Sequence, residues 1–160
     1  MGLADSHRVP ATESSHWQRY SVFSLKVLRI ATSLRIPCVL ENPSRLLLLK
    51  VPGILKLERT LFCTRHKFDV CGFSTHWKKE TELLCFDCSC FALDERRCHG
   101  RGCCSFSDRP HLTLQGSSPE GKNWTAIASA YPKRLARMTA AMIATAAVDR
   151  ATSAPDLLCR

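Results

Sequence analysis

The chain has 160 residues, 45% of them hydrophobic, which fits one globular domain and leaves little room for a second. Its formal net charge of +9 favours an anionic partner, with nucleic acid ahead of an acidic membrane surface. No apolar stretch suits a membrane span or a secretory signal, so we expect an intracellular, reducing compartment in which the ten cysteines are free or metal-bound rather than paired in a disulfide framework.

The first residues differ in composition from those that follow. Residues 1–18 are polar and predict a flexible N-terminal arm. From residue 20 to residue 34, apolar side chains recur every three to four positions, which predicts an amphipathic helix that Pro37 ends. We therefore expect one domain over residues 19–150 and a short tail over residues 151–160.

A short strand and a second helical segment are expected next. Residues 36–40 form a brief apolar run, and Pro43 prevents its continuation because proline has no N–H to donate to a strand partner. The second helical segment extends from residue 44 to about residue 57 and is interrupted at Pro52 and Gly53.

The second half of the chain predicts a strand pair, a long loop and a helix. Residues 61–73 alternate apolar and polar side chains, and residues 81–86 are a suitable hairpin partner. Residues 87–123 are rich in Cys, Arg, Gly, Ser and Pro, which is the composition of a loop and not of a core. A last helix begins near Tyr131 and ends before Pro155. Its apolar stripe consists of Leu135, Met138 and Met142.

The order of these elements predicts an α/β protein with too few strands for a complete doubly wound sheet. Four segments carry a more specific pattern: VLENPSRLLLL, FDVCGFSTHWKKET, CHGRGCCSFSDRPHLTLQG and SPEGKNWTAIASAYPKRLAR. In this order and spacing they resemble the carboxyl half of DNA cytosine methyltransferase-like proteins found in phages and in some protist genomes, over about residues 20–145. The resemblance implies a partial Rossmann-like methyltransferase sheet with a Cys-rich loop and a C-terminal helix.

The resemblance also gives Glu41, Asn42 and Pro43 a place in an active site. In cytosine-5 methyl transfer, a thiolate adds to C6 of a flipped base while a glutamic acid at a strand end contacts N3. Glu41 would be this general acid, Asn42 would hold the turn and Pro43 would stop the strand. Burial near a strand end suits that task because it raises a carboxyl pKa. From the residues alone, Asn-Pro-Ser is also good turn chemistry, and both interpretations stay open.

Two parts of such an enzyme are missing from this sequence. No glycine-rich loop that would hold S-adenosylmethionine precedes Glu41, and the only cysteine before it, Cys38, lies on the strand itself. The resemblance therefore implies a fragment, a decayed remnant, or a subunit whose partner chain supplies the S-adenosylmethionine half, and no activity for this chain alone. A truncated reading frame that folds poorly is a further alternative.

The cysteine-rich loop supports a second functional hypothesis, a basic nucleic-acid-binding module stabilised by zinc. Zinc requires four ligands in a tetrahedron, and a C-x2-C knuckle followed by another close pair supplies them. The alternative is that these thiols are buried as small hydrophobic groups. The spacing predicts the ligand candidates Cys85, Cys88, Cys98 and Cys103, with Cys90, His99, Cys104 and His111 in reserve.

Basic residues outnumber acidic ones over residues 95–137, which suggests contacts with DNA or another nucleic acid. Cations in the first turn of the last helix oppose its dipole at a cost of up to about 1 kcal/mol each, which favours a bound phosphate there. The alternative is a solvated face whose long side chains cover the Ala-rich helix. The candidate phosphate contacts are Lys78, Lys79, Arg101, Arg109, Lys133, Arg134 and Arg137.

Overall fold

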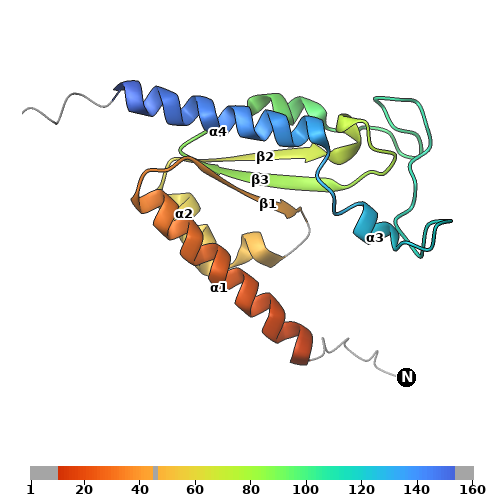
Figure 1. Ribbon diagram of the computed structural model, residues 1–160, viewed down its shortest axis with the longest axis horizontal. Helices are drawn as coiled ribbons and strands as arrows, with labels where there is room; N and C mark the ends of the chain where they lie inside the picture. The colour runs from red at the N-terminus through yellow and green to blue at the C-terminus, as the bar shows by residue number, and fades with distance from the viewer. Residues whose placement is uncertain (1–10, 45–46, 154–160) are drawn as a thin grey trace, which may run out of the picture.

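The computed structural model describes residues 11–44 and 47–153, apart from the side chains of residues 11–18 and 60. A three-stranded sheet lies between α4 on one side and the helices α1 and α2 on the other (Figure 1). None of the described helices combines the length and the apolar character needed to cross a membrane. The elements are α1 (Ala11–Ser33), β1 (Cys38–Pro43), η1 (Leu47–Lys50), α2 (Pro52–Thr60), β2 (Cys63–Asp69), η2 (Val70–Phe73), β3 (Glu80–Phe86), η3 (Phe91–Arg96), α3 (Trp124–Ile127) and α4 (Lys133–Ser153), where η marks a 3-10 helix.

Strand β3 is central and pairs antiparallel with both neighbours, in the order β1-β3-β2. Leu83 on β3 lies opposite Glu41 on β1 and His66 on β2. Because β1 and β2 both oppose β3, they run parallel to each other, and the segment that contains α2 joins them around the inserted strand. This is a split β-α-β arrangement. The pairing of β2 with β3 confirms the predicted strand pair, except that the first strand ends at Asp69, and Val70–Phe73 form the 3-10 helix η2 instead of continuing it.

The mixed α/β class is confirmed, but a Rossmann-like sheet is not. A Rossmann sheet is mostly parallel, with direct pairing between strands that run the same way. Within the described residues, each adjacent pair of strands is antiparallel, since β3 separates the two parallel strands. The described sheet is therefore a small antiparallel one flanked by helices.

Both faces of β3 are buried, and its side chains alternate between two apolar clusters. On one face Leu83 and Cys85 pack beneath α4, which contributes Leu135. On the other face Leu84 and Phe86 pack against residues of α1 and α2. The sheet is thus covered on both sides, and the β2–β3 connection at one end projects toward the cysteine-rich loop (Figure 1).

Several boundaries differ from the prediction. Helix α1 begins at Ala11, inside the predicted arm. The prediction missed its first turns because they are polar and lack the apolar spacing that indicates a helix. Strand β1 continues to Pro43, so Glu41 lies within a strand and not beyond its end. Proline is accepted at the last residue of a strand that lies at the sheet edge. The predicted second helical segment is divided just before Pro52, as expected, into η1 and α2, and Pro52 occupies the first turn of α2, which suits proline. The rest of the predicted arm and most of the predicted tail lie outside the described residues.

The segment over residues 87–123 is loop-like, as its composition predicts, yet it is not separate from the core. Apart from η3 and isolated bridges, it forms no regular structure. Leu93 is fully buried, however, and Cys98 and Cys104 are only 5% and 3% exposed. The expectation that this segment contributes no core was therefore wrong, because its cysteines provide small apolar side chains that a composition of polar and turn residues conceals.

Helix α4 confirms the predicted last helix and its apolar stripe. Leu135 is 1% exposed, and Met138 and Met142 pack against the same cluster.

We expect Leu135→Ala to lower the free energy of unfolding by about 2–5 kcal/mol, because it leaves a cavity under the helix. Val148→Ala on the same helix, at a side chain that is 60% exposed, is the control and should change it by less than about 0.5 kcal/mol. Urea unfolding followed by circular dichroism measures both, and equal effects would mean that α4 does not pack as described.

Candidate metal centre

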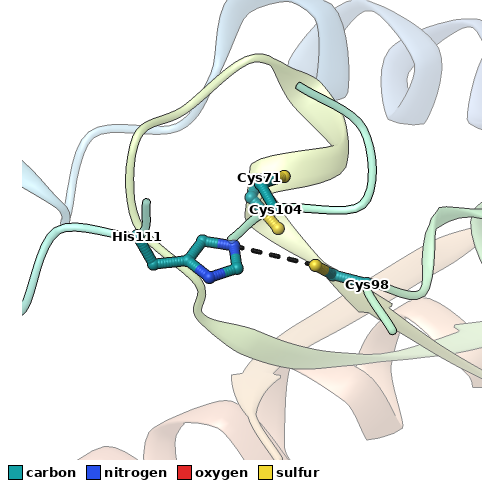
Figure 2. A group of neighbouring side chains, drawn as sticks. All are labelled: Cys71, Cys98, Cys104 and His111. Carbon is teal, nitrogen blue, oxygen red and sulfur yellow. Dashed lines mark hydrogen bonds between the residues drawn. The ribbon is translucent and has the colours of Figure 1, made fainter. Parts of the chain in front are cut away.

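Four potential metal ligands converge beside the end of β2. The Sγ atoms of Cys71, Cys98 and Cys104 and a ring nitrogen of His111 all lie within 4.8 Å of one another. Figure 2 shows these side chains gathered between the short helix η2 and the cysteine-rich loop, with the His111 ring beside Cys98. A tetrahedral site with Zn–S bonds of about 2.3 Å places its ligand atoms about 3.8 Å apart, so small movements would close this group around an ion. The arrangement can hold a metal ion.

The backbone of Cys98 is fixed from two sides. Its N–H donates to Oδ2 of Asp69 at 2.8 Å, and its carbonyl accepts from Nζ of Lys78 at 2.7 Å. Asp69 is the last residue of β2 and Cys71 follows it in η2, so the sheet positions both cysteines. Ser74 then takes a left-handed conformation, with φ 69°, and its N–H donates to the Cys71 carbonyl at 3.1 Å. The turn that ends η2 therefore also fixes Cys71.

The other two ligand candidates belong to a compact hairpin-like loop. Cys103 pairs with Pro110 in an isolated bridge, and the N–H of His111 donates to the Gly102 carbonyl at 3.0 Å. At the tip, the N–H of Cys104 donates to the Arg109 carbonyl at 2.7 Å. These hydrogen bonds bring Cys104 and His111 to the same side of the loop, although six residues separate them in the sequence.

Cys98 has the surroundings of a thiolate. Burial alone would raise its pKa, but hydrogen bonds from the N–H and Oγ of Ser105 and from the N–H of Gly100 outweigh it and lower the pKa of Cys98 to about 6. Both Ser105 donors lie 3.5 Å from the sulfur. A Cβ atom at Gly100 would collide with the Cys103 carbonyl, so only glycine permits this close turn. Such N–H donors around a thiolate are the outer contacts that metal ligands require.

The cluster has the composition of a closed structural site. Cys71, Cys98 and Cys104 are buried and His111 is half-buried, and three thiolates with one imidazole suit Zn²⁺. Comparisons with protein-family models, with curated proteins and with solved structures find no match to this chain. The hypothesis that this site holds a metal ion therefore rests on the chemistry of its four ligands.

Only one of the four ligand candidates named from cysteine spacing, Cys98, belongs to the cluster. Cys85 and Cys88 lie instead in the core beneath α4, where their thiols contact each other, and the Cys88 sulfur is 3.7 Å from the Cys38 carbonyl. Cys103 is exposed, while its neighbour Cys104 faces the cluster. The buried-thiol interpretation thus describes Cys85 and Cys88, because the C-x2-C spacing falls where β3 ends and its side chains enter the core.

Cys71 was not among the expected ligands. It lies 27 positions before Cys98, so no close pair in the sequence includes it. The signal that marks it is local: a cysteine two residues after a strand-ending Asp69, followed by Gly72, in the segment FDVCGF. Both reserve residues Cys104 and His111 belong to the cluster, whereas Cys90 is buried in the sheet core and His99 is exposed.

The expected phosphate contacts are brought together only in part. Arg109 and Arg134 line one cavity, in which Arg96 joins them although the sequence did not single it out. Lys78 donates to the Cys98 carbonyl, and Lys79 lies 3.9 Å from Oε1 of Glu41. The remaining candidates, Arg101, Lys133 and Arg137, are exposed and do not line the cavity.

Glu41 lies apart from the cysteine cluster, in a small polar group on the edge strand. Burial raises its pKa above the usual range, and the charge of Lys79 partly opposes this. Burial and the nearby Glu41 charge raise the pKa of Tyr131. The adjacent Asn42 is 4% exposed and its Nδ2 donates to the Pro43 carbonyl at 2.9 Å. Glu41 is thus a partly desolvated carboxyl next to a tyrosine and a lysine.

A buried histidine connects β2 to η3. Nδ1 of His66 lies 2.8 Å from Oδ2 of Asp94, and Nε2 accepts from the N–H of Cys90 at 3.2 Å. Because Nε2 is an acceptor, the proton belongs on Nδ1, where it is donated to Asp94. Oγ of Ser89 is 3.2 Å from Nε2, in the order of a Ser-His-Asp triad, but Ser89 does not line the cavity beside the cysteine cluster. This network fixes η3, and with it the segment that leads to Cys98.

The raised pKa of Glu41 predicts a pH-dependent stability. An acid whose folded pKa exceeds its unfolded value stays neutral more readily in the fold, so its ionisation above pH 4.5 destabilises the folded state. We expect Glu41→Gln to be more stable than the parent protein at pH 7 and to lose that advantage below about pH 4.5. Thermal unfolding across this range measures the difference, and Glu120→Gln at an exposed site is the control. A constant difference at all pH values would contradict the prediction.

Proposed function

We propose that this protein is a zinc-stabilised basic module that binds nucleic acid. The observation that carries the proposal is the convergence of Cys71, Cys98, Cys104 and His111 within 4.8 Å. Zinc ions in structural sites take four protein ligands and leave no open position, which matches a buried set of three thiols and one imidazole. The metal would join the end of β2 to the loop that bears the other ligands.

The loop supports a structural role for the metal. Residues 98–111 contain no helix or paired strand beyond the bridge at Cys103 and Pro110. The backbone hydrogen bonds within this segment join residues 102–111 to one another and not to the sheet. A metal ion that binds three residues of the segment together with Cys71 would therefore add stability that these bonds do not provide. The fold and the metal would then form together.

Positive charge supports the nucleic-acid partner. The chain carries a formal net charge of +9, and the loop and the start of α4 both present basic side chains. Arg101, Arg109 and Arg134 are exposed and form no ion pair with a carboxylate among the described residues. Unpaired surface cations attract the phosphate backbone independently of sequence.

The test measures metal and binding in the same purified protein. Elemental analysis should give about one zinc per chain, and a labelled single-stranded oligonucleotide should bind with an affinity that falls steeply as salt is added. Treatment with a chelator should remove the zinc and reduce both folding and binding. A protein that folds fully without metal, or that binds no oligonucleotide at low salt, would refute the proposal.

A second candidate function rests on Glu41. Its raised pKa is the property required of an acid that donates to N3 of cytosine, which supports the proposal that the chain is the carboxyl half of a DNA cytosine methyltransferase-like protein. S-adenosylmethionine does not fit the described residues, because no glycine-rich loop follows a strand in the described part of the chain. A partner chain would have to supply that half before methyl transfer could occur.

This second candidate predicts a preference for one base. A neutral carboxyl donates its O–H to the N3 acceptor of cytosine, whereas the ionised carboxylate has no donor and can only accept the N3–H of thymine. The affinity for an oligonucleotide with an unpaired cytosine, relative to its thymine counterpart, should therefore fall as the pH rises and Glu41 ionises. This pH dependence should disappear in Glu41→Ala and in Glu41→Gln, because the amide donates and accepts at every pH. Equal affinity for both bases in all three proteins would exclude this role.

A further inference from the structure

A cavity of about 290 Å³ opens directly beside the cysteine cluster. Its walls come from four places in the chain, among them Gly72 between β2 and β3, Phe106 and Arg109 in the loop, and Arg134 on α4. The fourth is η3, whose last residue, Arg96, also lines the cavity. Cys71 also reaches this cavity, so it adjoins the proposed zinc site.

The three arginines of the cavity lack carboxylate partners. No Asp or Glu lines the cavity, and none of Arg96, Arg109 and Arg134 forms an ion pair among the described side chains. The next residue along, Arg97, differs in this respect, because it lies 4.0 Å from Asp69 and 3.8 Å from Glu80. Three cations that share one cavity repel each other unless an anion joins them.

A zinc ion in the neighbouring cluster would not supply that anion. Three thiolates and one Zn²⁺ together carry one negative charge, which offsets only one of the three guanidinium groups. The cavity therefore stays positive in the zinc-loaded protein. Guanidinium groups present flat pairs of N–H donors that match the oxygens of a phosphate.

An aromatic ring borders the same cavity. Phe106 is 40% exposed, so part of its ring is free to contact a ligand. Gly72 forms the floor, where an added Cβ would lie 3.1 Å from Cβ of Arg96 and 3.3 Å from Cε2 of Phe106. A side chain at this position would thus press against both walls, and glycine keeps the space between the arginine and the ring open.

We propose that this cavity binds one nucleotide unit of single-stranded nucleic acid, with its phosphate on Arg96, Arg109 and Arg134 and its base against Phe106. The inference rests on the proposed function and names where the strand binds. An open aromatic ring beside a cationic groove is the combination by which proteins bind single strands without reading their sequence. The cavity volume suits one nucleotide and not a folded partner.

A metal ion in the cysteine cluster would also position the residues that line the cavity. Phe106 and Arg109 lie between two ligands, Cys104 and His111, in the hairpin-like loop. A metal ion that binds both ends of this segment would fix the ring and the guanidinium in place before the strand arrives. Pre-organisation of this kind lowers the entropic cost of binding.

The test uses the zinc-loaded full chain and a short labelled single-stranded oligonucleotide, with affinity measured by fluorescence anisotropy over a range of salt concentrations. We expect Arg109→Gln and Arg134→Gln each to weaken binding about two- to tenfold and to lower the salt slope by about 0.7. Phe106→Leu should weaken binding about tenfold with the salt slope unchanged. Arg29→Gln, at an exposed arginine on α1 on the opposite side of the sheet, is the matched control and should change neither quantity.

Competition identifies the source of the phosphate. Inorganic phosphate and a mononucleotide should displace the oligonucleotide only at far higher concentrations than an unlabelled strand. If the mononucleotide displaces it at the same concentration as the unlabelled strand, the cavity binds free nucleotides and the proposal of a bound strand is wrong. If Arg29→Gln weakens binding as much as Arg109→Gln and Arg134→Gln, or if none of them has an effect, the cavity is not the binding site. Zinc content is measured in every variant, so a failure of the metal site is seen separately from a failure of the cavity.

Discussion

Replacing Cys104 with Ser is expected to abolish zinc binding and to destabilise the protein, whereas the same replacement at its neighbour Cys103 should do neither. Cys104 lies within 4.8 Å of the other three ligand candidates, while the Cys103 side chain is exposed. Metal that binds only the folded state at a thousandfold excess over its dissociation constant stabilises it by about 4 kcal/mol, and Cys104→Ser would lose this contribution. Two adjacent cysteines thus provide a test in which chemistry and sequence position are matched.

The measurement combines metal content with thermal unfolding, with and without a chelator. Parent protein and Cys103→Ser should show the same melting temperature and the same drop on chelation, whereas Cys104→Ser should melt low in both conditions. Substitution with Co²⁺ adds a readout of the ligands, because thiolate-to-cobalt absorption reports how many cysteines are bound. Equal metal content in the two variants would contradict the assignment of Cys104.

Sequence patterns predict an element well when one of its faces is buried, because burial of that face sets the spacing of the apolar residues. The stripe of Leu135, Met138 and Met142 places one side of α4 on the sheet, and the spacing of three to four residues follows from that contact. The β2–β3 pair was predicted from the alternation of apolar and polar residues over residues 61–73 and from a suitable hairpin partner at residues 81–86. Local periodicity is sufficient where packing on a single face decides the structure.

The cysteine cluster could not be predicted from spacing because its members meet through the sheet. Cys71 belongs to the connection after β2, while Cys98, Cys104 and His111 lie beyond β3, so their proximity depends on the β2–β3 pairing. Ligand spacing rules detect pairs within one short loop, which is why they favoured Cys85 and Cys88. Cys85 is instead directed into the core by the alternation of β3, and Cys88, two residues beyond the strand, packs in the same cluster.

The position of Glu41 shows a related limit. Pro43 predicts that the strand stops, but whether a proline is tolerated depends on whether its strand lies at the edge of the sheet. In the described sheet β1 pairs only with β3, so its other side accepts Pro43. The order of strands in a sheet depends on the whole fold, so it cannot be predicted from a proline and its neighbours in the sequence.

Asp69 connects the sheet to the proposed metal site, and its removal is expected to have the second large effect. The side chain is 1% exposed, and its Oδ2 accepts the N–H of Cys98 at 2.8 Å and lies 4.0 Å from Nε of Arg97. Asp69→Ala would leave the N–H buried without an acceptor and would deprive Arg97 of one of its two carboxylates. We expect Asp69→Ala to lower the free energy of unfolding by about 3 kcal/mol. The ion pair contributes the smaller part of this loss because Arg97 is partly exposed.

A matched substitution separates the hydrogen bond from the charge. Asp69→Asn keeps an oxygen that accepts the Cys98 N–H but removes the negative charge near Arg97, so its loss should be about 1 kcal/mol. Because the hydrogen bond positions a ligand, Asp69→Ala should also weaken zinc binding by about 10- to 100-fold, and Asp69→Asn by much less. Competition with a chromophoric chelator measures the zinc affinity, and urea unfolding measures the stability. If both variants lose the same stability and keep full zinc affinity, Asp69 acts through its charge alone and the link from β2 to Cys98 is not what positions the ligand.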